Sequence, residues 1–192
     1  MTTHNTAEMR ICDAIWSIGV MLDYTQKIAG FVTPELLDWR PEFPAGDFAF
    51  SLGEQLMHIT DIRMWIVSQL GTEKHAYERW AGPYPGIDQP WTFRAGSHSE
   101  VMEALESSRQ LVQPWIERPM GELSLPTAGT VAAWEKALAA MREKGEDTSQ
   151  LEAKGAGTLG SALFFLLAHE NGHRTVTQTM LRMAGAPVER LA

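Results

Sequence analysis

The sequence predicts an all-α protein, built as a four-helix bundle with long crossover connections and one short accessory helix. In four long stretches the apolar residues recur three or four positions apart, which is the spacing of one helix face. Clusters of proline and glycine separate these stretches, and no run alternates apolar and polar residues as a strand would. A chain of 192 residues can bury a core, and its length indicates one domain over residues 1–192.

The first predicted helix runs from about Thr6 to Ala29. Asn5 or Thr6 can cap its start, and Gly30 suits its C-terminal end. Its apolar residues at helical spacing are Ile11, Ile15, Ile18, Leu22 and Ile28. The turn-rich segment that follows carries too many apolar groups for a free linker. We therefore expect a packed crossover, with a short helix after Thr33-Pro34.

The second predicted helix begins at Ser51 and ends near Gly71. Ser51 and Glu54 have the spacing of a capping box, in which each side chain bonds the backbone N–H of the other residue. The residues that mark the inner face of this helix are Leu52, Gln55, His58, Ile59, Ile62, Trp65 and Ile66. A long loop is expected over residues 81–96, where prolines and glycines are frequent.

The second half of the chain predicts two further long helices and a shorter one. The third helix begins at Ser97 or Ser99 and ends before Pro119. Residues 126–129 are expected to break the chain before the accessory helix, Val131 to Lys144. The segment from Gly145 to Gly157 is polar and is expected to be a loop. The last long helix begins at Thr158 and continues to about Ala184.

Charge and cysteine content restrict the location and the partners of the chain. A formal net charge of −8 without a lysine or arginine cluster argues against nucleic acid or an anionic membrane as the main partner. The single cysteine, Cys12, excludes an intramolecular disulfide and favours a reducing cytoplasm. The N-terminus lacks the basic and apolar regions of a signal peptide, and no stretch approaches the ~20 apolar residues of a membrane span.

Two histidines four residues apart, His169 and His173, are the strongest functional signal. Residues i and i+4 lie on the same side of a helix, so both imidazoles can reach one metal ion. We expect them in the middle of an inner stripe formed by Ala162, Leu166, His169, His173, Val176 and Met180. His58 also lies on an inner helix face. The sequence therefore predicts a metal site at His58, His169 and His173, with Glu170, Glu54 or backbone groups as outer hydrogen-bond acceptors. The alternative is a set of hydrogen-bonded core histidines without metal.

The segment from His169 to His173 also matches HExxH, the zinc-peptidase signature. Such a hydrolase needs a third ligand, but no histidine follows His173 and the only later acid is Glu189. No strand is predicted that would bind a peptide substrate. Glu170 lies about 100° around the helix from His169. We therefore expect it to be an outer, interhelical or interface residue and not a catalytic base.

Several segments together resemble the DinB-like (DinB/YfiT) superfamily. The matching segments are Ser51-Leu52-Gly53-Glu54-Gln55-Leu56-Met57-His58-Ile59 with Trp65, Leu37-Asp38-Trp39-Arg40-Pro41, His169-Glu170-Asn171-Gly172-His173-Arg174 and Met180-Leu181-Arg182-Met183-Ala184-Gly185. The resemblance implies a four-helix bundle, often a homodimer, with a divalent metal bound by His58, His169 and His173. Its characterised members include transferases and isomerases that use low-molecular-weight thiols. This chain differs from the family pattern at Val176, where glutamine is common, and in the longer segment 121–157.

The resulting functional hypothesis is a divalent-metal-binding protein, with Zn, Ni or Fe as candidate ions. It activates a thiol or water for transfer to, or hydrolysis of, a small electrophile, and no catalytic residue is assigned. The main alternative is a metal-binding bundle without turnover that serves as a stress-related binding protein. Trp80, Trp91 and Phe93, in or beside the long loop, are candidates for the mouth of a pocket.

Overall fold

The computed structural model describes residues 6–42, 49–71 and 96–188, and side chains from residue 17 onward. This part of the chain is helical and contains no strand, as the sequence predicts. The α-helices are α1 (Thr6–Ala29), α2 (Leu52–Leu70), α3 (His98–Ile116), α4 (Ala128–Glu143), α5 (Ser149–Lys154) and α6 (Leu159–Met183), with 3-10 turns η1 (Pro34–Leu36) and η2 (Met120–Glu122). None of the described helices is both long and apolar enough to cross a membrane.

The starts of the long helices are fixed by local side-chain hydrogen bonds. Ser51 caps α2, and the Glu54 side chain returns a hydrogen bond to the Ser51 backbone N–H over 2.6 Å. Ser97, and not Ser99, caps α3 in the same way with Glu100. These capping boxes bond backbone N–H groups that the first helical turn leaves without partners. The predicted start of α2 is therefore confirmed.

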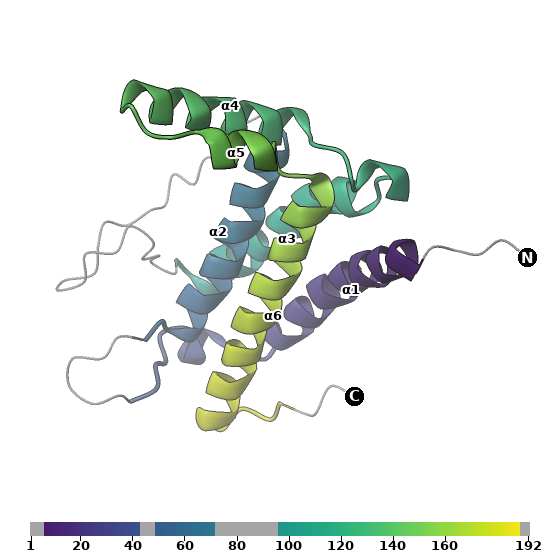
Figure 1. Cartoon of the computed structure of the whole chain (residues 1–192). Coiled ribbons are helices and arrows are strands. Elements are labelled where there is room, and N and C mark those ends of the chain that lie inside the picture. The colour runs from purple at the N-terminus through teal and green to yellow at the C-terminus, as the bar shows by residue number, and fades with distance from the viewer. Residues whose placement is uncertain (1–5, 43–48, 72–95, 189–192) are drawn as a thin grey trace, which may run out of the picture.

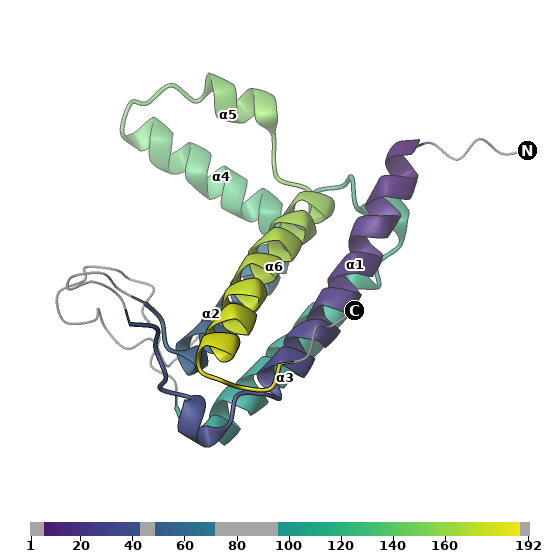
Figure 2. The ribbon, with the colours of Figure 1, turned by 90° about the horizontal axis from the view of Figure 1, so that it is seen from below.

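The four long helices lie side by side around a shared core (Figure 1). α2 packs mainly against α3 and α6, and α1 packs against the same two helices. Figure 2 shows the hairpin of α4 and α5 extending away from this group, near one end of α2 and α6. This arrangement places the histidine-bearing helices α2 and α6 next to each other along their length.

The core consists of two apolar clusters separated along the helices by buried polar residues. The cluster toward the start of α2 includes Ile28, Leu52, Leu56, Ile59, Leu105 and Leu181. The other includes Ile18, Leu22, Ile66, Val112, Leu163 and Leu166. Between them lie four buried side chains, one from each long helix: Thr25, Arg63, Ser108 and Glu170. We call these four residues the polar layer.

The segment between α3 and α6 differs from the prediction at two places. α4 begins at Ala128, within the expected chain break, because Thr127 caps it and Gly129 lets its backbone approach the end of α2. A Cβ atom at Gly129 would lie 2.3 Å from the carbonyl oxygens of Gln69 and Gly71. The expected loop 145–157 contains α5, whose six residues are too few to form a stable helix alone.

Contacts with α4 explain why α5 is nevertheless helical. The Trp134 indole N–H donates to the Leu151 carbonyl over 3.0 Å, and Arg142 pairs with Glu152 at 2.7 Å. These contacts join residues ten to seventeen positions apart. Local sequence pattern does not contain that information, so the prediction of a loop was wrong.

Candidate metal centre

The three predicted ligands converge in the structure. His58 lies in α2, while His169 and His173 lie one turn apart in α6. The Nε2 atoms of His58 and His169 are 3.1 Å apart. The ring centroid of His173 is 4.4 Å from each of the other two. One potential ligand nitrogen from each ring lies within 4.8 Å of the others, although His58 precedes the pair by more than one hundred residues.

The spacing of these nitrogens agrees with shared binding of one ion. Two nitrogens that each lie 2.0–2.1 Å from a tetrahedral ion are about 3.3 Å apart. The separation of 3.1 Å between the His58 and His169 nitrogens is close to that value. Without an ion, one of these two nitrogens must carry a proton to avoid facing its lone pair toward the other. The arrangement therefore fits a site in which three histidines bind one ion.

The histidine pair lies at the edge of the core, not in its centre as predicted. The buried residues of α6 are Leu159, Leu163, Leu166, Glu170, Thr177, Met180 and Leu181. His169 and His173 are half-buried, and Val176, expected on the inner stripe, is 43% exposed. Trp65 of α2 is likewise exposed by 47%. The true inner face is centred on Glu170, because a buried arginine attracts this acid inward. The site therefore combines a buried ligand with two that solvent reaches.

Hydrogen bonding orients one of the imidazoles. The Nδ1–H of His173 donates to the Gln55 Oε1 atom over 2.9 Å, which leaves Nε2 for a metal. Gln55 therefore takes the role expected of Glu54 or Glu170. The Glu54 carboxylate bonds the Ser51 backbone and Arg40 instead. In contrast, Nδ1 of His58 is buried and has no hydrogen-bond partner in the described part of the structure.

Burial keeps the three imidazoles neutral. Burial, followed by the nearby His173 and His169 rings, lowers the pKa of His58 to about 3. Burial, followed by the charge of His173, lowers the pKa of His169 to about 4. Burial also lowers the pKa of His173. Metals bind the neutral imidazole, so at pH 7 the ligand lone pairs are present without prior loss of a proton.

Aromatic rings surround the histidines. The Phe50 ring stacks on His58 at 5.5 Å between centroids, and Phe165 stacks on His169 at 5.9 Å. Trp65 meets Phe165 edge-on at 6.0 Å, and both rings are 47% exposed. A molecule that approaches the histidines from this side contacts apolar rings. The proposed mouth residues Trp80, Trp91 and Phe93 lie outside the described residues.

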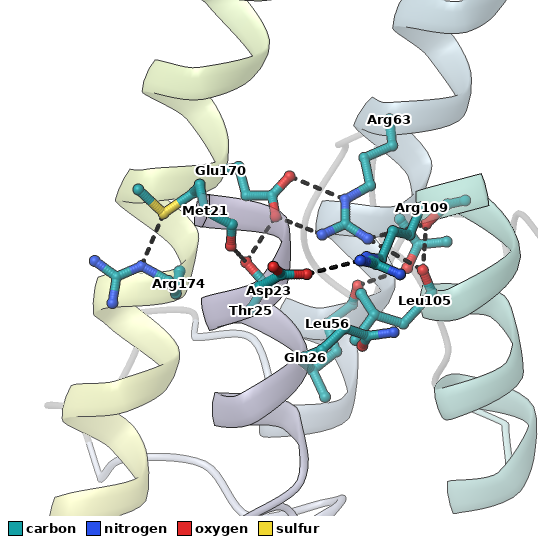
Figure 3. Close-up of polar contacts among 12 residues, drawn as sticks. Met21, Asp23, Thr25, Gln26, Leu56, Arg63, Leu105, Arg109, Glu170 and Arg174 are labelled. Carbon is teal, nitrogen blue, oxygen red and sulfur yellow. Dashed lines mark hydrogen bonds and ion pairs between the residues drawn. The ribbon is translucent and has the colours of Figure 1, made fainter. Parts of the chain in front are cut away.

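The Glu170 side chain points toward Arg63 in the polar layer (Figure 3). Its Oε2 accepts from Arg63 Nε over 2.9 Å, its Oε1 accepts from the second Arg63 nitrogen, and Thr25 donates to the same oxygen over 2.6 Å. Because both oxygens are occupied, Glu170 does not serve as the base of a zinc hydrolase. Of the outer, interhelical and interface roles expected for Glu170, the structure shows the interhelical one.

Arg63 is the important residue that the sequence interpretation missed. It is fully buried, and its remaining terminal nitrogen donates to the Leu105 carbonyl and to Ser108. The signal was present, because Arg63 occupies one position in a stripe of apolar residues four and three apart. That stripe is Leu52, Leu56, Ile59, Arg63, Ile66 and Leu70. A charge in such a stripe predicts a buried partner of opposite charge.

No family model matches the chain, and the searches of curated proteins and of solved structures find no match either. The functional argument therefore depends on the geometry of the three histidines and on the groups around them. Two properties of that geometry matter most. The ligand nitrogens come from two different helices, and two of the three rings are accessible to solvent.

Proposed function

We propose that this chain is a DinB-like four-helix bundle that binds one divalent metal ion through His58, His169 and His173. The metal-bound protein uses a low-molecular-weight thiol or water to attack a small electrophile. The observation that carries the proposal is the convergence of three neutral imidazoles, with 3.1 Å between the Nε2 atoms of His58 and His169. Three neutral nitrogen ligands with an open fourth position are typical of catalytic, not structural, zinc sites.

The chain's own residues have separable tasks in this proposal. The three imidazoles would hold the ion, and Gln55 fixes the ring orientation of His173. Phe165 and Trp65 present exposed apolar surface beside His169, which suits a small apolar electrophile. When bound, a divalent ion lowers the pKa of a water or thiol in its open position. In the transfer reaction the thiol sulfur forms a bond to carbon, the leaving group departs with its electron pair, and the thiol proton passes to solvent.

Metal analysis of untagged protein purified without chelator tests the site. We expect one equivalent of Zn, Ni or Fe per chain in the wild type and a loss of at least tenfold in His173→Ala. His98→Ala is the matched control, because His98 is also half-buried but bonds the Val32 carbonyl at 2.7 Å, outside the cluster. Equally low metal content in the wild type and in His173→Ala would disprove the metal site.

A second measurement separates turnover from binding. The metal-loaded protein is incubated with a low-molecular-weight thiol and a small alkylating electrophile, and thiol consumption is followed. We expect consumption above the uncatalysed rate, which His173→Ala loses and His98→Ala keeps. Full metal occupancy without any acceleration across several thiols would favour the alternative, a binding protein without turnover.

A further inference from the structure

The polar layer lies directly beside the histidine cluster. Arg63 and Glu170 face each other across the α2–α6 contact (Figure 3). Glu170 is the residue after His169, and Arg63 follows His58 by five positions. Arg63 is 0% exposed and Glu170 is 2% exposed. The ion pair and the proposed ligands are therefore carried by the same two helices, with Arg63 about 7.5 Å along α2 from His58.

The layer connects all four long helices by directional bonds. Thr25 of α1 donates to Glu170, and Arg63 of α2 donates to Glu170 of α6 through two nitrogens. Arg63 also donates to the Leu105 carbonyl of α3 over 3.1 Å and to Ser108 over 3.3 Å. The guanidinium is a rigid planar fork, so these contacts fix orientation as well as distance.

A buried ion pair is a poor way to obtain stability. Removing two charges from water costs about as much as their attraction returns, and apolar residues of similar volume often serve equally well. The two apolar clusters on either side already provide non-directional burial. The pair therefore needs an explanation other than stability, and its directionality supplies one.

The histidine site needs directional control of α6. A side-chain atom about 6 Å from a helix axis moves about 2 Å when the helix turns by about 20°. Metal–ligand distances tolerate changes of only about 0.2 Å. Leucine contacts alone allow small rotations with little cost, whereas a two-point bond from Glu170 to a planar fork does not. Because Glu170 and His169 are adjacent, fixing one fixes the direction of the other.

We infer that Arg63 and Glu170 are positioning residues for the proposed metal site. Their ion pair holds α6 at the rotation that brings His169 and His173 to His58. The inference rests on the proposed function only for its metal-binding readout, because the same positioning orients the imidazoles in the metal-free protein. There it maintains the bond from His173 to Gln55.

The test replaces the pair with apolar residues of similar size, in the double variant Arg63→Met/Glu170→Met. The matched control is Asp23→Asn/Arg109→Met, which removes an exposed α1–α3 ion pair of 2.7 Å without touching α6. Titration with Co²⁺ gives the dissociation constant and the visible absorption of the bound ion. We expect the polar-layer variant to remain folded by circular dichroism while its dissociation constant rises at least tenfold and its absorption bands change. The control should keep the wild-type values.

A folded double variant with wild-type Co²⁺ affinity and spectrum would overturn the inference. If the double variant does not fold, Arg63→Lys provides the test, because lysine keeps the charge and loses the planar fork. Its expected result is the same rise in dissociation constant, and wild-type binding by this variant would count against positioning.

Failure of the proposed function gives a different result. If wild-type protein binds no Co²⁺, the metal site is wrong and the imidazole nitrogens are compared by nuclear magnetic resonance in metal-free protein. We expect wild type and control to show His173 protonated at Nδ1, and the folded polar-layer or lysine variant to show a mixture of tautomers. An unchanged tautomer would disprove positioning independently of metal.

Discussion

The polar layer and the histidine cluster both lie where α2 meets α6, but they differ in whether their polar atoms have hydrogen-bond partners. In the polar layer, every nitrogen of the Arg63 guanidinium and both oxygens of Glu170 have hydrogen-bond partners. In the histidine cluster, His58 Nδ1 has no partner among the described residues, and two Nε2 atoms face each other at 3.1 Å. A satisfied network specifies structure, whereas a buried group without a partner indicates a missing ligand or proton.

The two clusters also differ in the charges that face each other. In the polar layer, groups of opposite charge face each other, because Arg63 pairs with Glu170. The histidine cluster contains like groups, and burial lowers the pKa of each imidazole. Asp61, one turn after His58, is like the histidines in that burial shifts its pKa toward the neutral form. It is 5% exposed, and burial raises its pKa to about 6.

The largest expected effect comes from removing one partner of the Arg63–Glu170 ion pair in the polar layer. Arg63→Met leaves Glu170 buried beside Thr25 without its cation, and the free energy of unfolding should fall by about 3–5 kcal/mol. Urea unfolding measures this change. The control Arg109→Met removes a partly exposed cation and should cost about 1 kcal/mol or less. An equal loss of unfolding free energy in both variants would show that the polar layer contributes no more to stability than a surface ion pair.

A smaller effect is expected from loosening the histidine cluster without removing a ligand. Gln55→Leu removes the acceptor of the His173 Nδ1–H, and the affinity for Zn²⁺ should fall about 10–100-fold. Competition with a chromogenic chelator measures the affinity. Gln55→Glu keeps an acceptor at the same place and should retain most of the binding. A Gln55→Leu variant with wild-type affinity would remove Gln55 from the site.

Asp61 provides a pH-dependent test of burial beside the histidine cluster. Its folded-state pKa of about 6 lies above the ordinary value of 3.8, so the ionised carboxylate destabilises the fold above about pH 6. This penalty decreases as the pH falls through 6 and is absent below about 3.8. Asp61→Asn should therefore gain about 3 kcal/mol relative to wild type at pH 7, and most of the gain should disappear near pH 4. Urea unfolding at both pH values measures it, and a pH-independent difference would contradict the assignment.

The smallest effect concerns the exposed side of α6 beside the histidines. Gly172 is a helix-interior glycine, and apart from its chain neighbours and the local helix backbone no described atom lies within 4 Å of a Cβ placed there. Gly172→Ala should raise the free energy of unfolding by about 0.5–1 kcal/mol and leave metal affinity unchanged. Gly129→Ala is the contrast, because its Cβ would meet two carbonyl oxygens and destabilise the α2–α4 contact. Loss of metal binding in Gly172→Ala would show that this side of α6 must stay open.

Local patterns predicted the elements better than they predicted which side each element buries. The Ser51–Glu54 capping box is a short-range motif, and the helix begins there. The inner face of α6 was predicted only in part, because Leu166 and Met180 are buried as expected, whereas Val176 is exposed and Glu170 is buried. Only the distant Arg63 explains that burial. Likewise α5 depends on contacts with α4 that no local window includes.

The histidine site was predictable for a related reason. His169 and His173 are close in sequence, and the helix period alone places them side by side. Their partnership with His58 follows from helical spacing in two segments together with the family resemblance, and the structure brings the three together. The tautomer-fixing acceptor was not predictable, because Gln55 competes with Glu54 for that role and only the packing of α2 against α6 distinguishes them.

The polar layer also has a consequence for how this sequence can drift over time. We expect replacement of Arg63 or Glu170 alone to destabilise the fold and replacement of both to weaken metal binding, so selection should preserve the two positions together. Distant relatives can then be sought with a joint pattern: histidine, four residues and arginine in one helix, and His-Glu-x-x-His in a later one. Such a pattern is more specific than the three histidines alone, because it requires a proposed metal ligand and a positioning residue in each of the two helices.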